Sequence, residues 1–146
     1  MARAIALPGA GQVKVIHPWL AFLLAFVTLG VYYVLWYGIR NSELNDFGTA
    51  HQRDGRNPLE VGTFGPIAAI TIGGIFIIPP FVSQWRFCRR IARAEQLVGL
   101  DRRVRPVIGM LLLIPGYFLL PLEIVYFQTH LNRLWEAAEE AALRGA

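Results

Sequence analysis

Three long runs of apolar residues, separated by polar segments, dominate the pattern along the chain. The runs cover residues 18–39, 61–82 and 107–127, and Glu123 is the only Asp, Glu, Lys or Arg within them. An α-helix rises ~1.5 Å per residue, so each run is long enough to reach across the ~30 Å hydrocarbon core of a bilayer. The pattern therefore predicts an all-α integral membrane protein with three transmembrane helices at about these positions.

The polar segments complete this prediction. Residues 1–15 are predicted to form a mobile N-terminal tail, and residues 16–146 a single membrane domain. Residues 128–143 follow the third run directly and are rich in Ala and Glu, with apolar residues at helical spacing. They predict a helical C-terminal extension in which Glu140 and Arg144 form an i, i+4 pair.

Composition and charge favour a membrane location. Hydrophobic residues make up 55% of the chain and charged residues 16%, whereas an average soluble protein has roughly 25% charged residues. The net charge of +4 is typical of topology signals and of contact with anionic lipid headgroups, and we expect no nucleic-acid partner. The N-terminal tail and second loop hold nine Lys and Arg residues, against five in the first loop and C-terminal segment. The positive-inside rule then predicts a multi-pass protein of the cell membrane with a cytoplasmic N-terminus.

A weaker internal repeat points to a second topology. Glycines interrupt the three runs near their middles, at Gly30, Gly73, Gly74 and Gly116. A polar residue follows each break 11 or 12 positions later, at Asn41, Gln84 and Gln128. Each unit is also consistent with a hairpin that dips into the bilayer, turns at its glycine and leaves by the same face. The pattern leaves both topologies open.

The same positions carry a resemblance to a known family. Residues 28–36 read TLGVYYVLW, residues 41–45 read NSELN, and residues 128–135 read QTHLNRLW. In these segments the chain resembles a prokaryotic membrane family catalogued as domain of unknown function 4234. The signature residues are Thr28, Gly30, Tyr32, Trp36, Asn41, Asn45, Gln128, Asn132 and Trp135. The resemblance implies a small multi-span bacterial membrane protein and no particular activity. The second run departs from the pattern, since Gly74 and Ile75 stand where tyrosine is expected.

The sequence lacks the motifs of common enzyme classes. It has no G-x-S-x-G, no H-E-x-x-H and no phosphate-binding glycine-rich loop. Its three histidines, His17, His51 and His130, lie in three different segments. We therefore expect a non-enzymatic protein with no catalytic residue, no cofactor and no metal site. The single cysteine, Cys88, lies among arginines that are expected to lower its pKa.

Glu123 is the strongest candidate for a functional residue, because ionisable groups within apolar spans are costly. With three crossings it lies in the same half of the membrane as Arg40, which ends the first run. This placement predicts a Glu123–Arg40 pair. A snorkelling acid and an ion or proton site are the alternatives.

Two further patterns predict contacts. Small residues that suit close helix packing are Ala21, Ala25, Gly65, Ala69 and Gly73. A lipid-facing basic surface is predicted from four arginines on one helix face, Arg86, Arg89, Arg90 and Arg93. We expect the lipid bilayer and its anionic headgroups as partners, and either a second copy or another membrane protein. The favoured function is a structural or interaction component of the membrane; the alternative is an oligomeric pore or carrier with Glu123 on its path.

Overall fold

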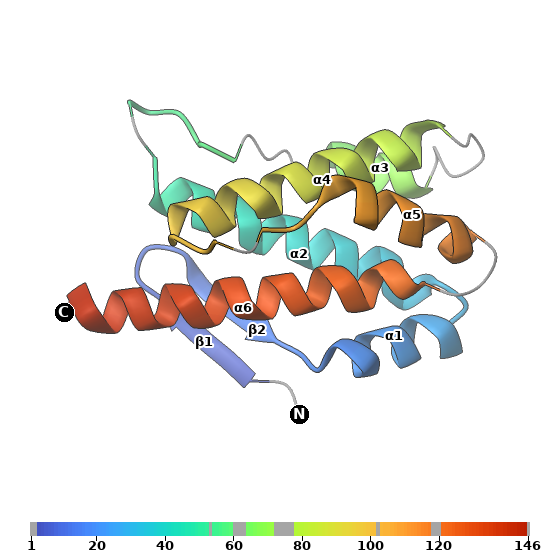
Figure 1. Cartoon of the computed structure of the whole chain (residues 1–146), viewed down its shortest axis with the longest axis horizontal. Coiled ribbons are helices and arrows are strands. Elements are labelled where there is room, and N and C mark those ends of the chain that lie inside the picture. Colours follow the sequence, from blue (N-terminus) through green and yellow to red (C-terminus); the bar gives the residue numbers. More distant parts are fainter. Residues whose placement is uncertain are drawn as a thin grey trace.

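The fold is a small β-hairpin followed by helices. A computed structural model describes residues 3–52, 54–59, 64–71, 78–101, 103–117 and 121–145. Strands β1 (Arg3–Leu7) and β2 (Gly11–Val15) are antiparallel. The helices are α1 (Pro18–Val27), α2 (Val31–Ala50), α3 (Phe64–Thr71), α4 (Ile78–Leu97), α5 (Pro106–Tyr117) and α6 (Leu122–Gly145) (Figure 1).

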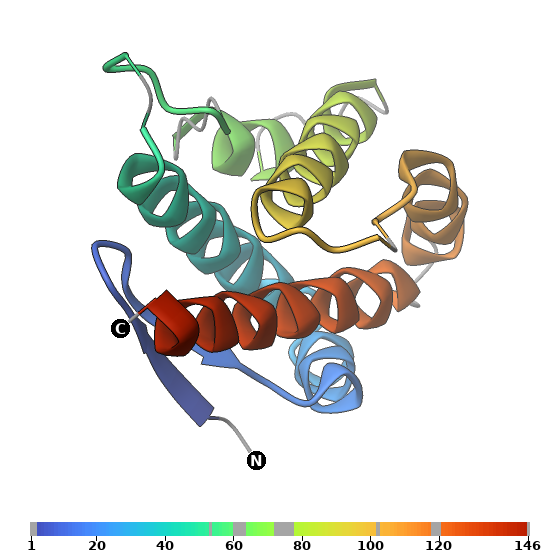
Figure 2. The same cartoon turned by 60° about the vertical axis from the view of Figure 1, so that its left-hand side comes forward.

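The helices are arranged as three hairpins, α1–α2, α3–α4 and α5–α6. In each hairpin the first helix is short, with 10, 8 and 12 residues, and the second is long, with 20, 20 and 24. Each helix packs on the next along the chain, and α6 packs back on α1 (Figures 1 and 2). The tips of the hairpins, where α1, α3 and α5 end, lie at the same end of the molecule, on the right in Figure 1. We call this end the hairpin end.

The first hairpin turns at Thr28, Leu29 and Gly30. Gly30 has a φ of +89°, a left-handed conformation that suits glycine, and its N–H donates to the carbonyl of Ala25 at 2.9 Å. The Thr28 hydroxyl donates to the Leu24 carbonyl at 2.7 Å and accepts from the Tyr32 N–H at 2.9 Å. One side chain therefore binds both the last turn of α1 and the first turn of α2, which explains why threonine and glycine stand two residues apart.

The prediction of three transmembrane helices is wrong. The first run divides between α1 and α2, the second between α3 and α4, and the third between α5 and α6. No helix in the described part of the chain is both long enough and apolar enough to cross a membrane. Hydropathy predicted the wrong topology because it measures only how apolar a run is. It does not report whether the chain reverses direction inside an uncharged run. The described helices follow the hairpin topology that the internal repeat left open, with a turn at Gly30. Gly116 lies within α5 and not at a turn, and Gly73 and Gly74 lie outside the described residues.

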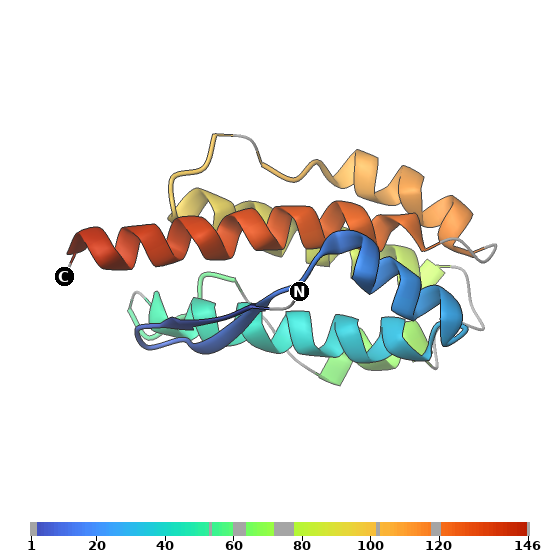
Figure 3. The ribbon, with the colours of Figure 1, turned by 90° about the horizontal axis from the view of Figure 1, so that it is seen from below.

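The prediction of a mobile tail over residues 1–15 is wrong for residues 3–15, which form the β-hairpin. Ile5, Leu7 and Val13 alternate with exposed residues and face the helices. The hairpin covers the far halves of α2 and α6 (Figure 3). Apolar residues at alternate positions on both sides of Pro8-Gly9 predict a β-hairpin from the sequence.

The centre of the molecule is aromatic. Phe87 of α4 contacts Tyr37 of α2 and Phe127 of α6, with ring centroids 4.9 and 5.4 Å apart. Each long helix thus contributes an aromatic ring to one core. Residues 128–143 lie within α6, where Arg144 is 2.9 Å from Glu140.

Helix packing uses some of the predicted small residues and one that was not predicted. Ala21 and Ala25 are buried, and α1 packs on α6. Gly65 is exposed with open space around it, Ala69 is partly buried, and Gly73 lies outside the described residues. The close approach lies instead at Gly109, where an added Cβ would come within 2.8 Å of Cys88 Sγ and 2.9 Å of the Phe127 ring.

Gly109→Ala is therefore expected to destabilise the protein by about 1–3 kcal/mol, because both neighbours are fully buried and must shift. Gly65→Ala is the matched control and is expected to be neutral or slightly stabilising. Thermal unfolding followed by circular dichroism in detergent measures both variants. Equal midpoints for the two variants would contradict the close packing of α5 on α4 and α6.

Candidate functional site

Exposed apolar side chains are concentrated at the hairpin end. Of the large hydrophobic residues that are exposed in the described part of the chain, only Leu97 and Leu143 lie elsewhere. The others are Trp19, Leu20, Leu23, Leu24, Phe26, Val27, Leu29, Val31, Leu35, Ile39, Val82, Trp85, Val107, Ile108, Leu111 and Ile114. Since a monomeric soluble protein rarely exposes so large a contiguous apolar surface, this end is a candidate binding surface.

The helices at the hairpin end have uncharged segments of similar length, measured from the hairpin tips. Helices α1, α3 and α5 contain no Asp, Glu, Lys or Arg, and α2 and α4 reach their first such residue at Arg40 and Arg86. At ~1.5 Å per residue, the uncharged segments extend roughly 12–18 Å from the tips. Glu123, near the start of α6, is the one exception, and it is buried.

Exposed aromatic and basic residues border this end. Trp19, near the start of α1, is 57% exposed, and Trp85 of α4 is 42% exposed. Arg86 follows Trp85 directly, and Arg105 immediately precedes α5; both are exposed. Tryptophan and arginine therefore lie where the uncharged segments end.

The polar residues of the internal repeat are buried between the hairpins. Asn41, Gln84 and Gln128 are all fully buried. Asn41 accepts from Arg90 of α4 at 2.6 Å, and Gln128 accepts from the Trp36 indole of α2 at 2.7 Å. Each bond joins two hairpins, so the recurring polar position serves assembly of the fold.

The remaining signature residues have similar roles. Asn132 binds the backbone of Ile16, accepting from its N–H at 3.3 Å and donating to its carbonyl at 2.7 Å. The Trp135 ring is 5.5 Å from the Phe47 ring, and the Asn45 carbonyl accepts from Asn57 at 3.2 Å. The signature that carries the family resemblance thus stabilises a turn and the interior.

The predicted Glu123–Arg40 pair does not form. Arg40 binds Glu43 and donates to the Lys14 carbonyl at 2.9 Å, which joins α2 to β2. Glu123 instead lies beside Tyr33, and burial raises the pKa of its carboxyl to about 7. The pair was predicted because three crossing helices would place both residues in the same half of the membrane. That position does not determine which residues of neighbouring helices face each other.

The predicted basic face of α4 is also divided. Arg86, Arg89 and Arg93 are exposed, whereas Arg90 is buried against Asn41. Cys88 is buried as well, and burial raises the pKa of its thiol to about 12. The expected lowering of this pKa by neighbouring arginines is wrong, because the thiol is buried, whereas Arg86, Arg89 and Arg93 are exposed and Arg90 binds Asn41.

A buried ionisable pair that the sequence did not reveal lies between α4 and α6. His130 Nδ1 is 2.5 Å from Glu95 Oε1, and Glu95 Oε2 accepts from the Val104 N–H at 2.6 Å. The pair ties the loop before α5 to the helices. No group of three or more His, Cys, Asp or Glu side chains suited to a metal is found among the described residues.

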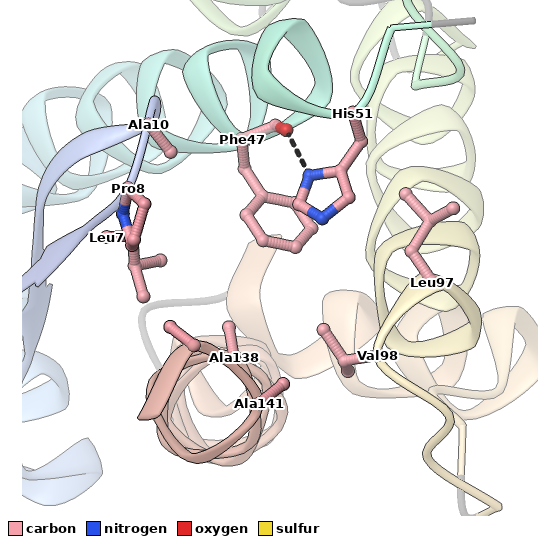
Figure 4. Close-up of a pocket in the computed structure, with 10 residues that line it drawn as sticks. Leu7, Pro8, Ala10, Phe47, His51, Leu97, Val98, Ala138 and Ala141 are labelled. Atoms are coloured by element: carbon pink, nitrogen blue, oxygen red, sulfur yellow. Dashed lines mark hydrogen bonds between the residues drawn. The ribbon is translucent and has the colours of Figure 1, made fainter. Parts of the chain in front are cut away.

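A cavity of about 300 Å³ lies at the end opposite the tips (Figure 4). It is lined by Leu7, Pro8, Ala10, Phe47, His51, Leu97, Val98, Ala138, Ala141 and Ala142. His51 Nδ1 is 2.9 Å from the Phe47 carbonyl, which only accepts, so in the neutral ring Nδ1 carries the proton. The second ring nitrogen is then an acceptor in a largely apolar cavity.

Comparison with known proteins identifies the family. Residues 17–93 match the family described as Domain of unknown function (DUF4234). The chain belongs to this family. The DUF4234 match covers the first two hairpins as far as Arg93 and includes the first signature turn. Searches of curated proteins and of solved structures find no match.

Proposed function

We propose that this chain is a non-enzymatic protein of the cell membrane that inserts its hairpin end into one leaflet of a lipid bilayer. The uniform depth of the uncharged end carries the proposal. One leaflet provides about 15 Å of hydrocarbon, half of the ~30 Å core, and the uncharged helical segments extend roughly that far from the tips.

The residues at the border of the hairpin end support a lipid partner over a protein partner. Tryptophan is enriched where hydrocarbon meets headgroups, which matches the exposed Trp19 and Trp85. Arg86 and Arg105 follow at the level of the headgroups, where arginine is attracted to anionic lipid. In this arrangement both termini and both loops between hairpins lie on one side of the bilayer. The multi-pass prediction depended on three crossing helices, so it is not part of this proposal.

Anchoring is favoured over a pore or carrier with Glu123 on its path. Glu123 is 2% exposed and lies beside Tyr33 inside the fold. A path formed between copies needs the carboxyl on an outer face, whereas the outer faces of α1 and α5 at this end carry only apolar side chains.

Leu111→Asp is expected to weaken binding to phosphatidylcholine–phosphatidylglycerol vesicles roughly a hundredfold, because a carboxylate within hydrocarbon costs about 2.5–3.5 kcal/mol. Leu111 is 60% exposed on α5, so the fold itself should be retained. Leu143→Asp, at a leucine 74% exposed on the far end of α6, is the matched control and should bind as the parent does. Flotation over a range of lipid concentrations measures both variants, and equal binding would contradict insertion of this end.

The same vesicles report the one-leaflet arrangement. Single cysteines replacing the exposed residues Gln52, Asp101 and Leu143 in a Cys88→Ala background should all react with an impermeant thiol reagent added outside. Protection of one of them, with reaction of the others, would show that the chain crosses the bilayer.

A further inference from the structure

The three hairpins meet at one polar junction inside the hairpin end. It consists of Tyr33 from α2, Gln84 from α4 and Glu123 from α6, one residue from each hairpin. The Gln84 amide donates to the Tyr33 hydroxyl oxygen, and the Tyr33 hydroxyl lies beside the Glu123 carboxyl. Gln84 is fully buried and Glu123 is 2% exposed.

Two oxygens of this junction lack a donor. Gln84 Oε1 and Glu123 Oε2 are buried and have no hydrogen-bond partner among the described residues. Both belong to groups beside the Tyr33 phenol, so they lie in one small region. An amide oxygen only accepts, and a carboxylate oxygen only accepts, so the ionised junction has two acceptors and no donor between them. Buried acceptors of this kind cost free energy unless a donor is supplied.

We propose that Glu123 is a proton-binding site, and that its neutral acid donates from Oε2 to Gln84 Oε1 and holds the three hairpins together. A single proton then satisfies both oxygens, and all three residues have hydrogen-bond partners. Loss of the proton turns Oε2 into an anionic acceptor that faces an amide oxygen, which weakens the contact between α6 and α4 at the hairpin end. The proposal concerns the fold itself and does not depend on insertion into lipid.

Among the described residues, no charged side chain is found that would hold Glu123 as an anion. Titratable groups at the junction are Tyr33 and Tyr37 from α2 and Cys88 from α4, all neutral near pH 7. Helices α1 and α3 contain no titratable side chain, and α5 contains only Tyr117. The nearest basic residues along the helices are engaged elsewhere or exposed: Arg40 binds Glu43, Arg90 binds Asn41, and Arg86 is exposed. Burial accordingly raises the pKa of Glu123 to about 7.

The direction of the pH effect follows from this pKa. The folded protein holds the proton up to about pH 7, whereas the unfolded chain releases it near its ordinary value of 4.5. The stability that the proton contributes is therefore complete below pH 4.5, falls as the pH rises towards 7, and is absent above that.

Glu123→Gln tests the site, because the glutamine amide donates where the acid does and does not titrate. At pH 5 the two proteins should have similar stability. Between pH 5 and pH 8 the unfolding equilibrium constant of the parent should rise on the order of a hundredfold relative to the variant. Other titrating groups are common to both proteins and cancel in this ratio. A ratio that stays constant with pH, or a variant less stable than the parent at pH 8, would overturn the proposal.

Two further measurements test the proposal if unfolding is not reversible. The thiol of Cys88, fully buried beside the junction, should react faster with a thiol reagent in the parent than in Glu123→Gln at pH 8, and equally fast in both at pH 5. Glu123→Leu removes the donor and leaves Gln84 Oε1 and the Tyr33 hydroxyl proton without a partner at position 123. It should therefore be less stable than Glu123→Gln at both pH values. Equal Cys88 reactivity in parent and glutamine variant at pH 8, or a leucine variant as stable as the glutamine variant, would contradict a donated hydrogen bond.

Discussion

Trp135→Ala is expected to destabilise the protein by about 3–5 kcal/mol, the usual cost of removing a buried tryptophan. Trp135 is fully buried in α6, and its ring lies 5.5 Å from the ring of Phe47 in an edge-to-face contact. The cavity left by alanine would open between α2 and α6, beneath the β-hairpin. For a chain of this size the loss corresponds to roughly 10–16 °C in the unfolding midpoint.

Trp19→Ala is the matched control, because Trp19 is 57% exposed on α1 and leaves no cavity. Its midpoint in detergent should stay close to that of the parent. Trp135→Phe should retain much of the stability that Trp135→Ala loses, because the Trp135 indole N–H has no hydrogen-bond partner among the described residues. Thermal unfolding by circular dichroism measures all three variants, and a similar loss for Trp19→Ala and Trp135→Ala would show that burial at Trp135 is not the cause.

Arg40→Met is expected to cost about 3–5 kcal/mol, because it leaves a buried carboxylate without its counter-charge. Arg40 is 1% exposed and binds Glu43, while Glu43 also accepts from the Lys14 N–H at 3.0 Å. The methionine side chain has a similar length, so packing is largely kept and the lost charge dominates. Burial already raises the pKa of Glu43 against the opposing effect of Arg40, and the variant should raise it further.

The double variant Arg40→Met, Glu43→Gln separates charge from packing. Glutamine removes the uncompensated charge and can still accept from the Lys14 N–H, so part of the loss should be recovered. A double-mutant cycle from denaturant unfolding gives the coupling between the two positions. Losses that simply add would mean that Arg40 and Glu43 act independently. At pH 5, where Glu123→Gln alone should be neutral, adding it to Arg40→Met should recover no stability, because Glu123 lies beside Tyr33 and Arg40 binds Glu43.

The hairpin arrangement explains how an apolar sequence and short helices occur together. The first helix of each hairpin is apolar throughout, whereas the second begins apolar and ends polar. Apolar residues from distant parts of the chain are thereby gathered at one end, and Arg40, Glu43, Glu95 and His130 lie beyond it. The Thr28 hydroxyl and the φ of Gly30 build the first of these turns.

The sequence by itself determined the features that depend on neighbouring residues. The three apolar runs, the break at Gly30, the helix over residues 128–143 and the signature from Thr28 to Trp135 were all readable, because each is a local pattern of residue types. The DUF4234 family followed from the same residues. The alternation of Ile5 and Leu7 before the Pro8-Gly9 turn is equally local and is a signal for the β-hairpin.

Only the tertiary structure decided how these elements turn and pair. An uncharged run has the same hydropathy whether its helix continues or folds back, so the change from three crossings to three hairpins rests on the turn at Gly30 and on packing between helices. Arg40 binds Glu43 and not Glu123, and Arg90 is buried while Arg86 is exposed, because a charged residue's partner is set by distances between separate helices. The meeting of Tyr33, Gln84 and Glu123 from three hairpins has the same cause: residues some forty to fifty positions apart become neighbours only when the hairpins pack together.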